Sequence, residues 1–191
     1  MNIVLASGSP RRRELLGRIV DNFQILESSF DENSVEYEGD VEKYVCDLSE
    51  GKADNVLGLL DEASIVIGCD TVVYIDGKIL GKPENKEAAI GMLKHLSGNT
   101  HKVYSGITII NTATGERVRR AVFTEVKFME LDDFLIEKYV ESGQCYGKAG
   151  AYGIQDDAAV FVEYIKGCYY NVVGLPLNTL FVMLRGMGVN L

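Results

Sequence analysis

The stretch of the sequence with the clearest chemical character begins with small residues and continues with three arginines. Residues 7–13 read Ser-Gly-Ser-Pro-Arg-Arg-Arg, where Ser9 suits a helix N-cap and Pro10 the first helical position. A helix N-terminus carries partial positive charge, so arginines there are repelled unless an anion lies between them. Guanidinium groups bind phosphate oxygens in pairs. The stretch indicates either a phosphate site or a solvated basic surface, and Arg11, Arg12 and Arg13 cannot all face one anion.

Two acidic positions are candidates for metal or water chemistry. Asp70 and Thr71 follow the apolar run at residues 64–69, and α/β proteins place ligands at the carboxyl ends of such strands. A carboxylate there can bind Mg²⁺ or act as a general base on water. The alternative is an aspartate that only forms the turn before a hairpin. Asp31-Glu32 can add a carboxylate to the same site, although alone it is only an acidic pair.

Two loops could bind the remainder of a nucleotide. Lys82 lies between Gly81 and Pro83, which favours a phosphate-binding lysine on a stiff loop or, alternatively, a surface lysine. Residues 147–155 read GKAGAYGIQ. The small residues allow the backbone to approach a flat ligand, and the Gln155 amide can donate to and accept from a base edge. A packing role is the alternative for this loop. His101 is expected to be a structural histidine rather than a catalyst.

Hydrophobic periodicity and turn residues predict the elements that must position these side chains. Strands are expected at residues 3–6, 23–26, 64–69, 72–75, 78–80, 103–110, 117–129, 160–165 and 168–173, and helices at residues 10–20, 41–60, 84–96, 132–142 and 176–185. Hairpins are expected at Asp76-Gly77 and at Lys166-Gly167. The pattern has no repeat or linker, and it predicts one α/β or α+β domain over residues 1–191 around a mixed sheet.

Composition excludes several functional classes. The 191 residues include 28 Asp and Glu against 19 Lys and Arg, a net charge of −9, which argues against binding to long nucleic acids. The four cysteines form no CxxC pair and there are two histidines, which argues against a structural zinc site or a disulfide framework. Reduced thiols and the lack of a signal-peptide or membrane-span pattern predict a cytoplasmic protein with no membrane partner.

Taken together, the motifs resemble the Maf family of nucleoside triphosphate pyrophosphatases. The matching stretches occur in family order from one end of the chain to the other. They are LASGSPRRRELL (5–16), DE (31–32), GKA (51–53), IVIGCDTVV (65–73), LGKP (80–83), LSGNTHKVYSGI (96–107), TEVKF (124–128), GKAGAYGIQ (147–155) and NVVGLPL (171–177). Each motif is weak alone, whereas the ordered set is specific.

The resemblance implies a fold, a reaction and a set of site residues. The implied fold is α/β and inosine triphosphatase-like, with a mixed twisted sheet flanked by helices and two lobes around a nucleotide-binding cleft, in a homodimer. The implied reaction converts a nucleoside triphosphate to the monophosphate and pyrophosphate with Mg²⁺ or Mn²⁺, as house-cleaning of nucleotide pools with a link to arrest of cell division. Asp70 matches the family's proton acceptor and, with Glu32, its metal ligands. The phosphate-site positions match Ser7, Arg11, Arg12, Lys52 and Lys82, and the specificity positions match Arg11, Thr71 and Gln155, as in the dTTP/UTP branch.

Four positions depart from the family pattern beside the loop expected to read the base. Gly147 stands where Asp is usual and Asp156 where Gly is usual, while Gln144 and Cys145 replace a common Glu-Pro. Two alternatives remain open. One is a non-catalytic nucleotide-binding regulator of septum formation, against which the intact Asp70, Lys82 and Arg11 argue. The other is a triphosphatase of the branch that acts on 7-methyl-GTP.

Overall fold

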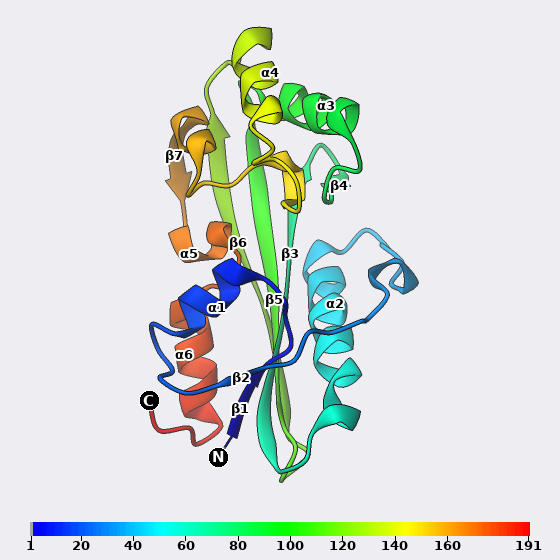
Figure 1. Ribbon diagram of the computed structural model, residues 1–191, viewed down its shortest axis with the longest axis vertical. Coiled ribbons are helices and arrows are strands. Elements are labelled where there is room, and N and C mark those ends of the chain that lie inside the picture. The colour runs from blue at the N-terminus through cyan, green and yellow to red at the C-terminus, as the bar shows by residue number, and fades with distance from the viewer. Residues whose placement is uncertain (1) are drawn as a thin grey trace. The chain divides into compact units, whose positions relative to one another are not determined.

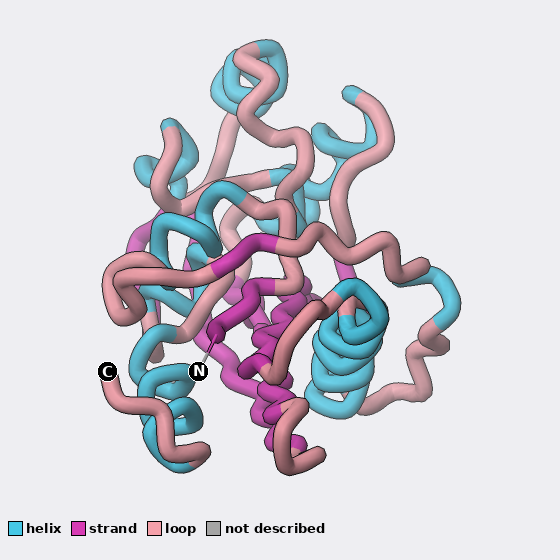
Figure 2. The backbone as a smooth tube through the Cα atoms, turned by 60° about the horizontal axis from the view of Figure 1, so that its bottom comes forward, coloured by secondary structure: helices cyan, strands magenta, loops and turns pink. Residues whose placement is uncertain are grey.

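The computed structural model describes residues 2–191, which form a mixed β-sheet flanked by helices (Figures 1 and 2). The seven strands follow the order β2-β1-β3-β5-β6-β7, with β4 paired to β3. β1 is parallel to both β2 and β3, whereas β4 is antiparallel to β3 and β7 is antiparallel to β6. The predicted α/β class with a mixed sheet is therefore confirmed.

Most elements begin and end close to the predicted residues. The strands are β1 Asn2–Leu5, β2 Gln24–Ile25, β3 Ser64–Ile75, β4 Lys78–Leu80, β5 Thr100–Asn111, β6 Arg117–Phe128 and β7 Val162–Lys166. The α-helices are α1 Pro10–Leu16, α2 Val41–Asn55, α3 Lys86–Leu96, α4 Asp133–Glu141, α5 Tyr169–Val173 and α6 Leu177–Gly186. None of these helices, within residues 2–191, is long and apolar enough to cross a membrane.

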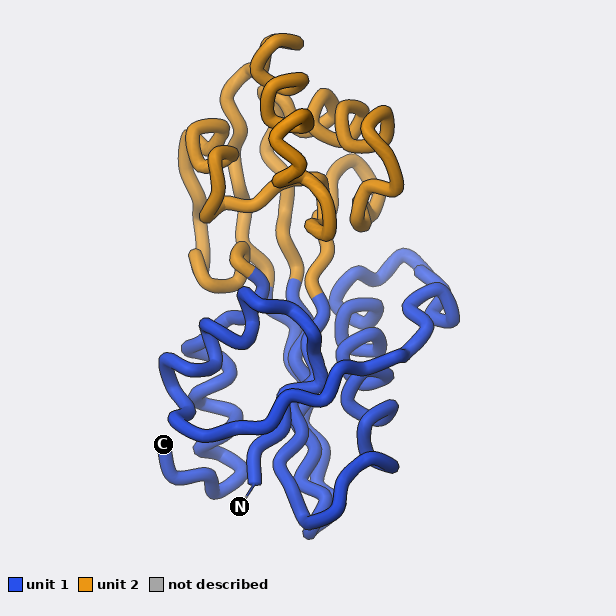
Figure 3. Tube along the Cα trace, viewed as in Figure 1, with its two compact units in different colours: residues 1–70, 105–122, 174–191 blue, residues 71–104, 123–173 orange. Residues whose placement is uncertain are grey.

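Two compact units share these elements (Figure 3). The first unit contains the residues up to Asp70 together with residues 105–122 and 174–191. The second contains residues 71–104 and 123–173. The predicted site residues therefore divide into two groups, each of which is described within its own unit.

In the first unit, β1 is the middle one of three parallel strands. The chain leaves β1 through α1 to reach β2 and then passes through α2 to reach β3, and these two helices lie on opposite sides of the strands (Figures 1 and 2). Ligands in such sheets bind beyond the carboxyl ends of the strands, where the connections diverge to the two faces. Leu5 at the end of β1 pairs with Ile67, so Ser7 and Asp70 both follow this point.

Two glycines allow α2 to lie directly on the sheet. A Cβ on Gly68 of β3 would overlap the carbonyl oxygen of Ser49, and a Cβ on Gly106 of β5 would overlap that of Val45. Ser49 also forms a buried hydrogen bond to Thr108 on β5, with 2.7 Å between their hydroxyl oxygens. These contacts fix the height of the helix above β3 and β5.

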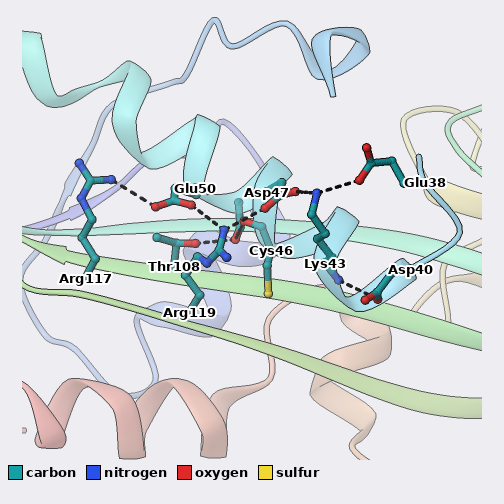
Figure 4. Close-up of polar contacts among 10 residues, drawn as sticks. Glu38, Asp40, Lys43, Cys46, Asp47, Glu50, Thr108, Arg117 and Arg119 are labelled. Carbon is teal, nitrogen blue, oxygen red and sulfur yellow. Dashed lines mark hydrogen bonds and ion pairs between the residues drawn. The ribbon is translucent and has the colours of Figure 1, made fainter. Parts of the chain in front are cut away.

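Ion pairs on the solvent side join α2 to β6 (Figure 4). The Arg119 guanidinium lies 2.6 Å from the Glu50 carboxylate and 2.9 Å from Asp47, and Arg117 lies 2.7 Å from Asp54. Individual exposed pairs stabilise a protein only weakly. Here they repeat along one helix and one strand, so together they oppose sliding of α2 along the sheet.

The second unit contains the β3–β4 hairpin, and its turn confirms the prediction from Asp76-Gly77. Both residues have positive φ, 49° at Asp76 and 78° at Gly77, as a type I′ turn requires. Tyr74 pairs with Ile79 across this hairpin. The turn joins β3 to β4, and β4 leads directly into the Gly81-Lys82-Pro83 loop.

The prediction that a strand ends at Asp70 was wrong, because β3 is unbroken from Ser64 to Ile75. The run of apolar and β-branched residues continues on both sides of Asp70, and its carboxylate is paired within the structure, so the strand tolerates it. Two helices are shorter than predicted. α1 ends at Leu16 before Gly17, and α2 ends at Asn55, after which a separate 3₁₀ turn spans Leu57–Leu59.

The predicted hairpin between residues 160–165 and 168–173 was also wrong in its second half. Residues 162–166 do form β7, but β7 pairs with β6, and the following segment is the helix α5. The Asn171 amide of α5 donates hydrogen bonds to the Val103 carbonyl oxygen and to Thr124 Oγ1, at 2.9 and 3.0 Å. These long-range side-chain bonds stabilise a conformation that local β-propensity does not favour.

The close approach of α2 to β3 generates a stability prediction. Gly68→Ala should lower the free energy of unfolding by roughly 1–3 kcal/mol, because the added methyl group must push α2 away from the strand. The matched control is Gly91→Ala in α3, where a Cβ meets nothing within 4 Å. That substitution should stabilise the protein by roughly 0.5–1 kcal/mol through helix propensity. Urea unfolding of both variants checks this, and equal effects would contradict the packing argument.

Candidate active site

A buried lysine joins two carboxylates in the first unit. Lys52 Nζ contacts Asp70 Oδ1 and lies 2.9 Å from Glu32 Oε1. The side chains of Lys52 and Asp70 are 11% and 8% exposed, and that of Glu32 is 42% exposed. A buried charge is stable only when it is paired. The three groups therefore form one cluster of ion pairs, in which Glu32 is the most exposed member.

The local structure explains how each member reaches this point. Lys52 is in the last turn of α2, four residues after the buried Leu48, so it lies on the helix face that packs on the sheet. Asp70 is two residues after Gly68 on β3 and therefore shares its face of the sheet. Glu32 begins a 3₁₀ turn that the Asp31 carboxylate caps by accepting the Asn33 N–H at 3.0 Å. Asp31 is thus a capping residue, and Glu32 is the member of the acidic pair that faces the lysine.

Tyr44 is a further residue on which the charges of Asp70, Glu32 and Lys52 act. It lies on α2, eight residues before Lys52 and thus on a similar face of the helix. Burial raises the pKa of the Tyr44 hydroxyl, and the negative charges of Asp70 and Glu32 raise it further. The Tyr44 hydroxyl is therefore neutral at physiological pH.

Arg12 is held by backbone and side-chain acceptors. Its Nε donates to the Gly174 carbonyl oxygen at 2.9 Å, and its Nη1 donates to Ser7 Oγ at 3.3 Å. The Cys69 thiol donates to the same Gly174 oxygen at 3.3 Å. The Gly174 carbonyl therefore links Arg12 to the residue next to Asp70, a connection that no sequence motif reveals.

The remaining arginines take different positions. Ser9 caps α1 and Pro10 is its first residue, as predicted, and the Arg12 N–H bonds to Ser9 Oγ. Arg11 is partly buried, whereas Arg13 is exposed. The expectation that the three side chains cannot all face one anion is consistent with this division.

In the second unit, the glycine-rich loop contacts the loop that carries Lys82. The Gly150 N–H donates to the Gly81 carbonyl oxygen at 3.0 Å, immediately before Lys82. Gly150 has a φ of +67°, and a Cβ there would crowd the Val73 side chain on β3, so only glycine fits. Lys82 and Gln155 are both exposed, at the ends of two loops that this contact holds together.

The unusual residues near Gln155 close this loop by polar contacts. Asp156 Oδ2 lies 2.8 Å from Lys148 Nζ, and the Gln144 amide donates to Asp157 Oδ2 at 2.7 Å. The Asp157 N–H donates back to Gln144 Oε1 at 3.1 Å. The departures at Gln144 and Asp156 therefore serve to fix both ends of the segment that presents Gln155.

His101 is structural, as expected, although it lies on a strand rather than in a loop. Its Nε2 is 2.7 Å from the Tyr152 hydroxyl, and its ring packs edge-on against Phe128. Burial lowers the pKa of His101 from 6.5 to about 3, so the ring is neutral at physiological pH. Tyr152 belongs to the glycine-rich loop, so this buried pair also positions that loop.

The structure thus brings together Lys52, Asp70 and Glu32, and it links Ser7 to Arg12 in the same unit. Thr71, Lys82 and Gln155 belong to the second unit. Arg11 shares the first unit with the lysine and the two carboxylates.

The carboxylates of Asp70 and Glu32 fit a divalent cation, because both already face a single positive group, the Lys52 ammonium. Mg²⁺ is commonly bound through one or two carboxylates, with waters and substrate phosphates as the other ligands. Among residues 2–191, no group of three or more His, Cys, Asp or Glu side chains is placed to hold a metal by itself.

Comparison with known proteins gives a consistent result. A family model described as Maf-like protein matches residues 2–187. Proteins named dTTP/UTP pyrophosphatase from Clostridium kluyveri and Clostridium perfringens strain 13 are 56% and 54% identical, with complete coverage of both chains in each case. One of the same name from Clostridium botulinum strain Okra is 53% identical over all of this chain and 99% of its own.

A more distant likeness comes from a solved structure. It is described as a nucleoside-triphosphatase / dITP/XTP pyrophosphatase from Mycobacterium abscessus, and it aligns with a TM-score of 0.41 at 14% identity. The alignment covers 69% of this chain and 76% of that one. At this level the likeness says nothing about function.

The buried histidine generates a prediction about pH. Because the folded pKa of His101 is about 3 and the unfolded value is 6.5, the unfolded state binds an extra proton between these values. Stability from this group is therefore complete above pH 6.5 and falls on acidification by about 1.4 kcal/mol per pH unit. Urea unfolding from pH 7 to 5 should show a steeper loss for the wild type than for His101→Gln.

The comparison with His101→Gln cancels the contribution of the many carboxylates, which are the same in both proteins. His101→Asn provides a second neutral side chain of smaller size. Parallel stability profiles for the wild type and both variants would show that His101 titrates normally in the folded state.

Proposed function

Because this chain belongs to the Maf-like protein family, we propose that it is a nucleoside triphosphate pyrophosphatase that converts UTP and dTTP to the monophosphate and pyrophosphate. The observation that carries the proposal is the buried Asp70 carboxylate, held by Lys52 beside Glu32 beyond the carboxyl end of β1. The names of the full-length relatives support the choice of substrates.

The basic residues of the first unit supply charge for the triphosphate. Arg11, Arg12 and Lys52 all belong to the first unit, in a chain whose net charge is −9. Arg12 is fixed by its bonds to Gly174 and Ser7, which orients its guanidinium before a ligand arrives. Such preorganised cations stabilise the charge that develops on phosphoryl oxygens in the transition state. Lys82 is proposed as a further phosphate ligand from the second unit.

Asp70 is proposed as the proton acceptor. A water oxygen attacks the α-phosphorus, and its proton passes to the Asp70 carboxylate. The bond from the α-phosphorus to the oxygen bridging to the β-phosphorus breaks, and the electron pair leaves with pyrophosphate. In the free protein, Lys52 orients the Asp70 carboxylate through its contact with Oδ1. No cysteine takes part, since attack by water needs no covalent intermediate on the protein.

The reaction is proposed to use Mg²⁺ or Mn²⁺ held by Asp70 and Glu32. A divalent cation bound there would neutralise negative charge on the triphosphate. The protein's own part is to present the two carboxylates from β3 and from the turn after Asp31, at positions that the contact with Lys52 already defines.

Base selection is proposed to depend on Arg11, Thr71 and Gln155. Gln155 is exposed and lies in a loop that the Lys148–Asp156 and Gln144–Asp157 contacts hold in place. We propose that its amide forms hydrogen bonds with the edge of the base. Neither the branch that acts on 7-methyl-GTP nor a non-catalytic regulator of septum formation is favoured by a contact in this structure. The homodimer and the cytoplasmic location remain predictions.

A substrate panel tests the proposed reaction. With Mg²⁺ or Mn²⁺, the purified protein should release pyrophosphate and the monophosphate from UTP and dTTP faster than from ITP or 7-methyl-GTP. Products are separated by ion-exchange chromatography. Inactivity on every nucleotide would reject the enzyme, and preference for 7-methyl-GTP would move the protein to the other branch.

A substitution at Asp70 tests its role. Asp70→Asn should lower kcat by about 10²–10⁴-fold, because the amide cannot accept the proton from water. Nucleotide binding, measured by calorimetry, should persist. Asp31→Asn is the matched control, since an asparagine can also cap the turn before Glu32. A fully active Asp70→Asn protein would remove Asp70 from the chemistry.

A further inference from the structure

Lys52 contacts both of the carboxylates proposed as metal ligands. Its ammonium group touches Asp70 Oδ1 and lies 2.9 Å from Glu32 Oε1. These two residues come from separate elements, and a single positive group between them is what brings their oxygens to one place. The ammonium therefore occupies the position toward which both carboxylates turn.

The ion pairs of Lys52 with Asp70 and Glu32 disfavour binding of a free divalent cation to these two carboxylates. Two carboxylates and one ammonium carry a net charge of −1. A divalent cation bound between the same two oxygens, Asp70 Oδ1 and Glu32 Oε1, would displace Lys52 from its partners and leave a largely buried ammonium unpaired. An unpaired buried charge is strongly unfavourable. Binding of the free cation is therefore penalised by the loss of the ion pairs.

A nucleoside triphosphate removes this penalty. Its phosphates carry several negative charges and can accept hydrogen bonds from the ammonium group. They also supply the oxygen ligands that the two carboxylates do not provide. Binding of the triphosphate would thus give the Lys52 ammonium a new partner and, at the same time, give the cation further oxygen ligands.

We propose that Lys52 blocks the metal site in the free protein and couples metal binding to nucleotide binding. The lysine holds Asp70 and Glu32 until a triphosphate attracts its ammonium group away. This inference rests on the proposed function, because it takes a triphosphate as the ligand. By reciprocity of binding free energies, the nucleotide strengthens metal binding by the same factor as the metal strengthens nucleotide binding.

Mn²⁺ binding measures this coupling without turnover. Free Mn²⁺ is followed by electron paramagnetic resonance, with and without the α,β-imido analogue of UTP, which cannot release pyrophosphate. The wild type should bind Mn²⁺ at least tenfold more tightly with the analogue than without it. In Lys52→Met, the affinity for Mn²⁺ alone should rise at least tenfold, and the coupling factor should fall below that of the wild type, leaving only the part that the phosphate ligands contribute.

Two controls separate the proposal from a general effect of charge. Lys94→Met removes a positive charge from an exposed ion pair with Asp133 and should leave the Mn²⁺ affinity within twofold of the wild type. Lys52→Met combined with Asp70→Asn should lose the gained affinity, which would assign the cation to this site. Lys52→Arg retains a cation and should remain weak in Mn²⁺ binding.

The outcomes distinguish this inference from the proposed function. The inference is overturned if Lys52→Met binds Mn²⁺ alone no more tightly than the wild type. If Lys52→Met does not fold, the test uses the Mn²⁺ affinity of the wild-type protein. Equal affinity with and without the analogue also overturns the inference. The proposed function fails if no nucleotide is hydrolysed or if 7-methyl-GTP is preferred, and the substrate panel measures this separately.

Discussion

The ion pairs of one buried lysine determine how the first unit is organised. Lys52 needs partners because its ammonium is largely removed from water, and Asp70 and Glu32 are those partners. To reach Asp70, the last turn of α2 must lie against β3, which only the absence of a side chain at Gly68 permits. The Ser49–Thr108 hydrogen bond and the pairs of Arg117 and Arg119 then hold the helix at that height and register.

The sheet supplies the other half of the site through its connections. The chain leaves β1 at the edge where Leu5 pairs with Ile67 of β3, and α1 and α2 lie on opposite sides of these strands (Figure 1). Ser7 and Asp70 lie at that edge, and Arg12 is tied to it through the Gly174 carbonyl. Arg12, which we propose as a phosphate ligand, and Cys69, which precedes the proposed proton acceptor Asp70, thus share the Gly174 carbonyl oxygen as an acceptor.

Local patterns in the sequence predicted the elements with characteristic end residues and missed what depends on distant partners. The N-cap at Ser9, the Asp76-Gly77 turn and the class of the sheet follow from nearby residues. The helix at residues 169–173 could not be predicted, because its Asn171 bonds to β5 and β6. The sharing of the Gly174 carbonyl oxygen by Arg12 and Cys69 could not be predicted either, because every residue has a backbone carbonyl and residue types do not show which one accepts. Lys52 did leave a signal, as a charge on the buried face of an amphipathic helix.

In the proposed reaction, water attacks the α-phosphorus of the nucleotide. Hydrolysis of UTP in water enriched in ¹⁸O shows which phosphorus is attacked when the products are analysed by mass spectrometry. One ¹⁸O atom should enter the uridine monophosphate and none should enter pyrophosphate. Label in the pyrophosphate, or products that consist of the diphosphate and inorganic phosphate, would contradict it.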